Sequence, residues 1–459
     1  MSERARGQWL LGLVAVALVV AGLVAVDQVG PEDPEPAADR QAGEAMSGAW
    51  YCPHGGGEGW AGRLFLANPG TETVAARVTG FSKDDPSEPQ TIDVEPGSTV
   101  TVPVRAESLG ASTMVEYFGG WIAAGWGTEA GGDESGAAAE PCAPDVADHY
   151  YLPDGTTDRG HTANAIIMNP FDSDAVFTVT VTTQKGRPII LSEWRDFVLR
   201  PHHSVALELN EAVAGESAVG AIIDVRLGRV AAASLGTLAS GGVRSVVGVT
   251  EAGERSILPG GLDTNSAMVE VMNTSEGHAS LNAAVLTDDS EQTGAGIQGQ
   301  TVEPGASLSF SVITSSPSSL DITADLETPG GGVVATRRTY GISGDFGATA
   351  GVTAPGPRWV VLPAVTDPPY DPRLLLTNPG EEDVKARLTL LGAQGKSMVV
   401  PVPARRTVLV PTEFTRAAPT MAVLVEVDGG GGVAPVFVAY SEDGADYAVA
   451  TGTEAPAGS

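Results

Sequence analysis

The residues that could carry chemistry are few and scattered along this chain of 459 residues. His54 begins a His-Gly-Gly-Gly run, which in lipases and esterases presents backbone N–H groups to a developing oxyanion. That arrangement works only beside a serine nucleophile on a strained G-x-S-x-G turn, and the sequence contains no such turn. The run therefore predicts a glycine-rich loop and no hydrolase site.

A second glycine pattern, Gly57 to Gly62, matches the G-x-G-x-x-G fingerprint of dinucleotide-binding folds. Its glycines serve a cofactor only where a helix follows, because the pyrophosphate lies at the N-terminus of that helix. Here the apolar run Leu64 to Asn68 follows, and it has no helical pattern. We predict a loop leading into a strand, and we expect no cofactor.

Carboxylates and histidines offer two further possibilities. Asp154, Asp158 and His161 are close enough in the chain to meet in one loop, where they could ligate a metal ion. Surface solvation explains them equally well, and no H-x-x-x-H pair supports a metal site, so we expect none.

One acidic residue also recurs at the same place in four similar segments, as Glu116, Asp224, Asp325 and Glu426. Glycosidase chemistry needs two carboxylates facing each other ~5–10 Å apart. A single acid in each of four separate segments marks the exposed side of an alternating strand instead. The sequence thus predicts no catalytic residue, and we expect a protein that is not an enzyme.

Aromatic residues concentrate between residues 50 and 126, although they make up only 5% of the chain. Flat exposed rings stack on sugars or on protein partners, and tryptophan is enriched in binding hot spots. The candidate ligand-binding residues are therefore Trp50, Trp60, Trp121 and Trp126. The alternative is that these rings fill the core of the first domain.

Four sequence marks recur in each of four segments. The first is an apolar pair or its equivalent before proline: Tyr51-Cys52-Pro53, Tyr151-Leu152-Pro153, Ile257-Leu258-Pro259 and Val361-Leu362-Pro363. The second is an apolar run that ends at an asparagine: Asn68, Asn169, Asn273 and Asn378. A proline-centred turn and a terminal hairpin follow, and period-two alternation between them indicates strands with one buried face.

Glycine and proline turns between short Val-rich runs predict an all-β protein of tandem immunoglobulin-like β-sandwich domains. The marks place these domains at residues 49–147, 148–253, 254–352 and 353–459. One large propeller of paired blades is the alternative. If the four sandwiches stack end to end, they form a rod.

Only two cysteines occur, Cys52 and Cys142, and both lie in the part of the chain that we expect to be exported. Disulfides persist outside the cytoplasm. We predict that the two cysteines pair and close most of the first domain, whereas two buried free thiols are the alternative.

Residues 9–26 are uncharged and almost wholly apolar, and at ~1.5 Å per helical residue they reach across a bilayer. Basic residues lie in the preceding residues 1–8 and acidic ones in the following 27–48, which predicts a cytoplasmic N-terminus and a single-pass plasma-membrane anchor. A cleaved signal peptide is the alternative, and the protein is then secreted.

The Pro- and acid-rich residues 27–48 predict a disordered linker. The net charge of −31 disfavours nucleic acid as a partner.

The opening Ala49-Trp50-Tyr51-Cys52-Pro53 and the following Asn68-Pro69-Gly70 resemble an uncharacterised family of actinobacterial secreted or membrane-anchored proteins, a domain of unknown function. The resemblance covers the chain from about residue 48. It implies an envelope protein of a high-GC Gram-positive bacterium, and it implies no activity and no site residues.

We therefore expect a non-catalytic, membrane-anchored extracytoplasmic envelope protein that acts as a structural or protein-interaction scaffold. The alternative is a surface protein that binds polysaccharide through the four tryptophans. Membrane, envelope proteins and polysaccharide are the partners to test.

Overall fold

The computed structural model describes residues 47–131, 135–262, 266–314, 316–340, 346–365, 370–392, 396–417, 419–441 and 447–456. Ala45–Ser459 form one compact unit, which holds all the strands discussed below. The predicted anchor (residues 9–26) and nearly all of the predicted linker (27–48) lie outside the described residues. Within the residues that are described, no helix has the length and apolar character needed to cross a membrane.

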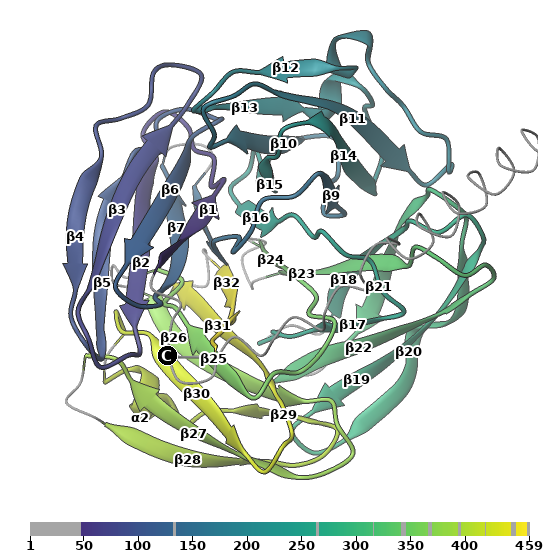
Figure 1. Ribbon diagram of the computed structural model, residues 1–459. Coiled ribbons are helices and arrows are strands. Elements are labelled where there is room, and N and C mark those ends of the chain that lie inside the picture. The colour runs from purple at the N-terminus through teal and green to yellow at the C-terminus, as the bar shows by residue number, and fades with distance from the viewer. Residues whose placement is uncertain are drawn as a thin grey trace, which may run out of the picture. The chain divides into compact units, whose positions relative to one another are not determined.

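Short strands fall into four groups along the chain, which we call repeats 1 to 4 (Figure 1). Repeat 1 contains β1 (Ser47–Cys52), β2 (Ala61–Asn68), β3 (Val74–Phe81), β4 (Gln90–Val94), β5 (Ser98–Val104), β6 (Ser112–Phe118), β7 (Ala123–Ala130) and β8 (Gly136–Pro141). Repeat 2 contains β9 (His149–Leu152), β10 (His161–Asn169), β11 (Ala175–Thr183), β12 (Phe197–Leu199), β13 (His203–Glu208), β14 (Val219–Leu227), β15 (Ala231–Leu238) and β16 (Val243–Val247).

Repeat 3 contains β17 (Arg255–Leu258), β18 (Ser266–Asn273), β19 (Ala279–Thr287), β20 (Glu291–Val302), β21 (Ser307–Ile313), β22 (Ser318–Leu326), β23 (Val333–Tyr340) and β24 (Phe346–Ala350). Repeat 4 contains β25 (Arg358–Val361), β26 (Tyr370–Asn378), β27 (Val384–Leu390), β28 (Ser397–Val402), β29 (Arg406–Leu409), β30 (Val423–Asp428), β31 (Ala434–Ser441), β32 (Tyr447–Thr451) and β33 (Thr453–Glu454). The described helices are single turns: η2 (Ser192–Trp194), η3 (Leu209–Glu211) and α2 (Thr412–Thr415).

All four repeats have the same antiparallel topology. The first, sixth, third and fourth strands form one sheet, and the fifth, second, seventh and eighth form the other, with β33 added beside β25 in repeat 4. The prediction of an all-β fold is confirmed. The strand order differs from that of an immunoglobulin domain, in which the first strand pairs with the second, because here the first strand pairs with the sixth.

The two sheets of each repeat enclose a hydrophobic core. In repeat 3, for example, Val269 and Val271 of β18 pack with Leu281 and Val285 of β19 from the opposite sheet. Repeat 1 is further closed by the disulfide between Cys52 and Cys142, which has an S–S length of 2.03 Å. The predicted pairing of the two cysteines is confirmed.

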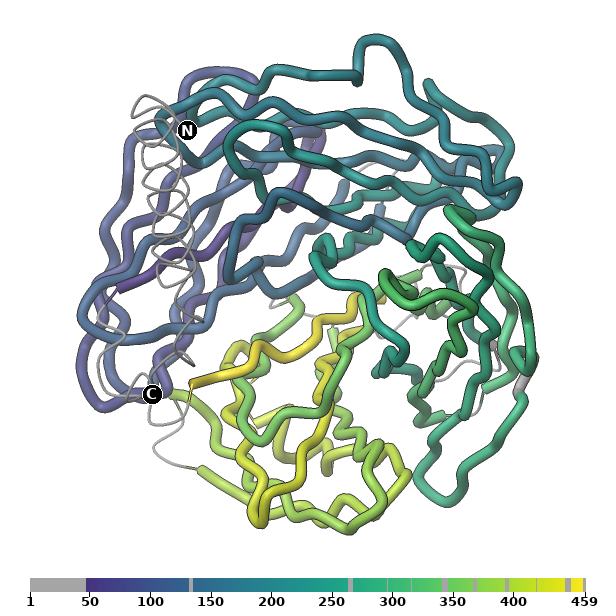
Figure 2. Tube along the Cα trace, turned by 45° about the vertical axis from the view of Figure 1, so that its right-hand side comes forward, coloured from purple at the N-terminus to yellow at the C-terminus, as the bar shows by residue number. Residues whose placement is uncertain are grey.

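The repeats do not form a rod, because the outer faces of their sheets are buried against each other. Phe65 and Ala123 of repeat 1 pack with Val360 and Leu424 of repeat 4, which joins the last repeat to the first. The eight sheets of the compact unit therefore stack face to face around a ring, as the blades of a propeller do (Figures 1 and 2). The expected end-to-end arrangement is wrong, since it leaves these apolar faces exposed to water.

The eighth strand of every repeat lies at the centre of this ring. β8 contacts β16, β16 contacts β24, β24 contacts β32, and β32 contacts β8. Three of these strands, β8, β24 and β32, carry many small residues, such as the Gly-Ala-Ala-Ala run of β8, because four strands meet around one axis.

Candidate functional site

The four candidate tryptophans lie mostly inside repeat 1. Trp50, Trp60 and Trp126 are 3%, 7% and 1% exposed, and Trp50 Nε1 donates a hydrogen bond to the Ile122 carbonyl. Trp121 is half-buried and packs edge-on against Trp50. The four rings therefore do not form an exposed platform, and the burial favours the alternative that they fill the core.

The His-Gly-Gly-Gly run is a loop whose hydrogen-bonding groups are already used. Backbone N–H groups of His54, Gly55 and Gly57 donate to carbonyls of Cys52, Ala111 and Ala106. Both ring nitrogens of the fully buried His54 contact oxygens, and burial lowers the pKa of His54 to about 4. The segment runs into β2, so the interpretation of both glycine patterns as a loop is confirmed.

The recurring acids of the sixth strands lie on sheet surfaces, where three of them contact an arginine or histidine side chain of a neighbouring strand. Glu116 pairs with Arg77, Asp224 contacts His149, and Glu426 pairs with Arg358. Each acid belongs to a different repeat, so the ring does not bring two of them into one catalytic pair.

The asparagines of the second sequence mark form hydrogen bonds both within their own turn and to the opposite sheet. Asn68, Asn169, Asn273 and Asn378 are all at most 1% exposed. In each, the side-chain oxygen accepts the N–H two residues ahead, while Nδ2 donates both to the carbonyl four residues ahead and to the last residue of the fourth strand. Each asparagine thus ties its own turn to the opposite sheet.

A buried ion cluster joins repeat 2 to repeat 3 and includes one of the three candidate metal ligands. Asp154 accepts hydrogen bonds from Arg244 and Arg338, and Arg338 also pairs with Glu270 at 2.6 Å. The side chains of these four residues are 0–4% exposed. Because both oxygens of Asp154 face guanidinium groups, they are not available to a metal ion. The other two candidate ligands, Asp158 and His161, are not members of this cluster.

The charges of this cluster are strongly perturbed by burial. Burial raises the pKa of Glu270 to about 8, although Arg338 and Arg244 act to lower it. Burial also acts to raise the pKa of Asp154, but the two arginines outweigh it and hold that pKa below its ordinary value. Nearby Glu140 has its pKa raised well above the usual range by burial and by the charge of Asp154.

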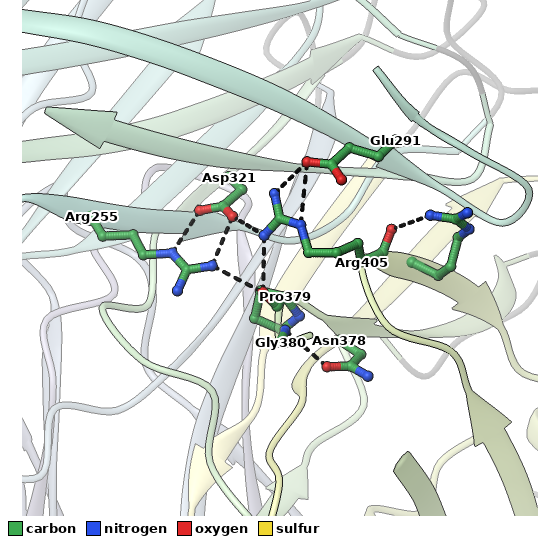
Figure 3. Close-up of polar contacts among 8 residues, drawn as sticks. Arg255, Glu291, Asp321, Asn378, Pro379, Gly380 and Arg405 are labelled. Carbon is green, nitrogen blue, oxygen red and sulfur yellow. Dashed lines mark hydrogen bonds and ion pairs between the residues drawn. The ribbon is translucent and has the colours of Figure 1, made fainter. Parts of the chain in front are cut away.

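A second ion cluster joins repeat 3 to repeat 4 and is partly open to solvent (Figure 3). Asp321 of β22 accepts two bonds from Arg255 and one from Arg405, and Arg405 continues to Glu291 at 2.6 Å. Both arginines also donate to the Pro379 carbonyl. Burial acts to raise the pKa of Asp321, but the two arginines outweigh it and lower that pKa.

A cleft of about 230 Å³ opens beside this second cluster. Its lining includes Asn282, Gln298 and Thr323 from repeat 3, together with Asp321 and Arg405. Both carboxylate oxygens of Asp321 are committed to guanidinium groups, so the arrangement holds two repeats together.

Sequence reasoning missed both ion clusters, although the signal for Arg405 was present. The proline-centred turns place Gly97, His202, Gly305 and Arg405 at the same position, and all four have φ between 55° and 67°. An arginine in this left-handed conformation costs energy that glycine avoids. The presence of an arginine at this strained position in repeat 4 indicates that its side chain contributes contacts.

The comparisons with known proteins give a family but no activity. No curated protein matches the chain. The model of a family of unknown function, DUF5719, matches residues 119–364, which is more than half of the chain and runs from the end of β6 to just after β25. The chain therefore belongs to the family of unknown function DUF5719.

Proposed function

We propose that this chain is a non-catalytic, membrane-anchored scaffold of an actinobacterial cell envelope, whose ring of four repeats presents a fixed surface to other envelope proteins. The observation that carries the proposal is that three side chains suited to acid–base chemistry, Asp154, Asp321 and His54, are committed to structure. Asp154 and Asp321 are each held by two arginines, and both ring nitrogens of His54 have partners.

The closed ring supports a role that needs a rigid shape. Buried seams join neighbouring repeats, and the contact between repeats 4 and 1 removes the free ends that a chain of separate domains would have. A surface built this way moves little when a partner binds, which lowers the entropy cost of association. The apolar residues 9–26 support the anchoring part of the proposal.

Polysaccharide binding through the tryptophans of repeat 1 finds no support in their positions. Three of the rings are buried, and a sugar needs access to the flat face of a ring.

Crosslinking of the full-length chain in its native membrane tests the proposal. We expect defined envelope proteins to be recovered. An Ala123→Glu variant, which places a charge in the seam between repeats 4 and 1, should lose them, whereas Thr91→Glu on the exposed edge of β4 should retain them. Recovery of no defined protein, or of the same proteins by both variants, contradicts the scaffold proposal.

A further inference from the structure

A fully buried arginine near the centre of the ring has terminal amino groups without partners. Arg244 lies on the central strand β16, and its side chain is 0% exposed. Its Nε donates to Asp154, but neither Nη1 nor Nη2 has a hydrogen-bond partner among the residues that the structure describes. A buried unpaired donor destabilises the fold, and a charged one does so more strongly. The site therefore calls for an acceptor.

The groups around this guanidinium leave its N–H edge unsatisfied. The ring of Phe346 on β24 lies 5.2 Å from Arg244 Cζ and attracts the cation through its face, but a ring face cannot accept all four N–H bonds of the two amino groups. A Cβ on Gly236 would lie 2.4–2.6 Å from the guanidinium atoms, so the strand is shaped to fit the arginine closely. His161, whose ring is 6.1 Å from that of Phe346, has a buried Nδ1 that is likewise unpaired within the described part of the chain.

The charge balance favours an anion as the missing acceptor. Two guanidinium groups, Arg244 and Arg338, face the carboxyl groups of Asp154 and Glu270. Burial raises the pKa of Glu270 to about 8, so this carboxyl is largely neutral at pH 7 and the cluster carries an excess positive charge. Burial and the nearby arginines lower the pKa of His161, which keeps its ring neutral and leaves Nδ1 free to carry a donating hydrogen.

We propose that Arg244 Nη1 and Nη2 bind a small monovalent anion of halide size, with His161 Nδ1 as a further donor, in the wall where β16 meets β24. Full burial of the arginine side chain favours a halide over a larger oxyanion, because a spherical ion needs only slightly more room than a water molecule. The ion completes the charge balance between repeats 2 and 3.

Crystals of the full-length chain grown with sodium bromide test the proposal directly. We expect an anomalous bromide peak in direct contact with an Arg244 Nη atom. In solution, replacing gluconate with chloride or bromide at constant ionic strength should raise the unfolding midpoint by about 1–3 °C and then saturate, because the anion binds the folded state.

Matched lysine variants assign the effect to the site. Arg244→Lys removes the two amino groups and should abolish the halide effect. Arg337→Lys should retain it, because the equally buried Arg337 donates to Ser318 and Thr339 instead. If Arg244→Lys does not fold, the bromide map of the unaltered chain decides. Water density alone at Arg244 with equal midpoints in all anions, or a halide effect that persists in Arg244→Lys, overturns the proposal.

Discussion

At the scale of single residues, the fold depends on buried polar side chains. Their hydrogen-bond donors and acceptors match the surrounding groups in only one chemical form, such as an amide or a neutral imidazole. The repeated asparagines use the amide oxygen as an acceptor and the amide nitrogen as a donor at the same time. Each therefore links a local turn to the far sheet of its own repeat, a role that neither a carboxylate nor an apolar residue fills. His54 shows the same principle, since its buried ring stays neutral.

Asn378→Asp should destabilise the protein by about 2–4 kcal/mol, because the carboxylate loses both donated bonds and faces the carbonyl oxygens of Glu382 and Val402. Asn282→Asp is the matched control, since among the described residues the Asn282 side chain accepts a bond from the Gly299 N–H and donates none, and the carboxylate can accept the same bond. Denaturant unfolding of both variants measures the difference. Equal losses would show that the donated bonds do not matter.

The neutral ring of His54 should make the protein sensitive to acid. The pKa of His54 is about 4 in the folded state and near 6.5 when unfolded, so the unfolded chain binds the proton first and stability falls as pH drops from about 6.5 to 4. The full shift corresponds to about 3 kcal/mol. Unfolding measured across this range should fall less steeply for His54→Gln than for the unaltered chain. Parallel pH profiles would contradict the assignment to His54.

At the scale of elements, the turn between the fourth and fifth strands contributes a side chain in repeat 4 that forms ion pairs with repeat 3. The turn between the fourth and fifth strands has a left-handed residue in all four repeats, and in repeat 4 that residue is Arg405, which reaches Asp321 and Glu291 of repeat 3. The backbone cost of an arginine at this position is offset by contacts that join two repeats.

Arg405→Gly should relieve about 1 kcal/mol of backbone strain but still lower the free energy of unfolding by about 2–3 kcal/mol in total, because Asp321 loses one of its two arginines. His202→Gly changes the same turn position in repeat 2, where the side chain makes an exposed pair with Asp172 and stacks on Phe81, and it should lower stability by about 1 kcal/mol, less than Arg405→Gly. Chemical denaturation compares the two. A stabilised Arg405→Gly variant would mean that strain outweighs the ion cluster.

Strand β32 shows why a sequence pattern does not predict every element of the fold. In repeat 4 the four sequence marks end at the terminal hairpin and give no sign of β32. Its sequence, Tyr-Ala-Val-Ala-Thr, contains two alanines, which have low strand propensity. Such small residues are required there by the crowded centre of the ring, which is a property of the assembled fold.

At the scale of the whole molecule, the ring depends on sheets that are buried on both faces. In β2, Leu64, Phe65, Leu66 and Ala67 are all at most 1% exposed, so one side of the strand faces the core of repeat 1 and the other faces repeat 4. A rod of separate sandwiches would leave the second face in water. Closure of the ring is therefore driven by the same burial that stabilises each repeat.

Ala123→Glu should open the seam between repeats 4 and 1, because Ala123 is fully buried there and an unpaired carboxylate is costly to desolvate. We expect small-angle X-ray scattering to report a larger radius of gyration and unfolding to become less cooperative. Thr91→Glu adds the same charge on an exposed edge and should leave both measurements unchanged. An unaltered scattering profile for Ala123→Glu would contradict a closed ring held by this seam.

The sequence by itself determined the all-β class, the four-fold repetition and the Cys52–Cys142 pair, because turn residues, alternation and cysteine count are local signals. It also contained a sign of the ring: the apolar runs before the asparagines are continuous, as in strands buried on both faces. Only the tertiary structure decided that the sheets close on themselves, that three tryptophans are buried, and that Asp154 and Asp321 meet arginines from other repeats. These contacts join residues far apart in the chain, so no local spacing encodes them.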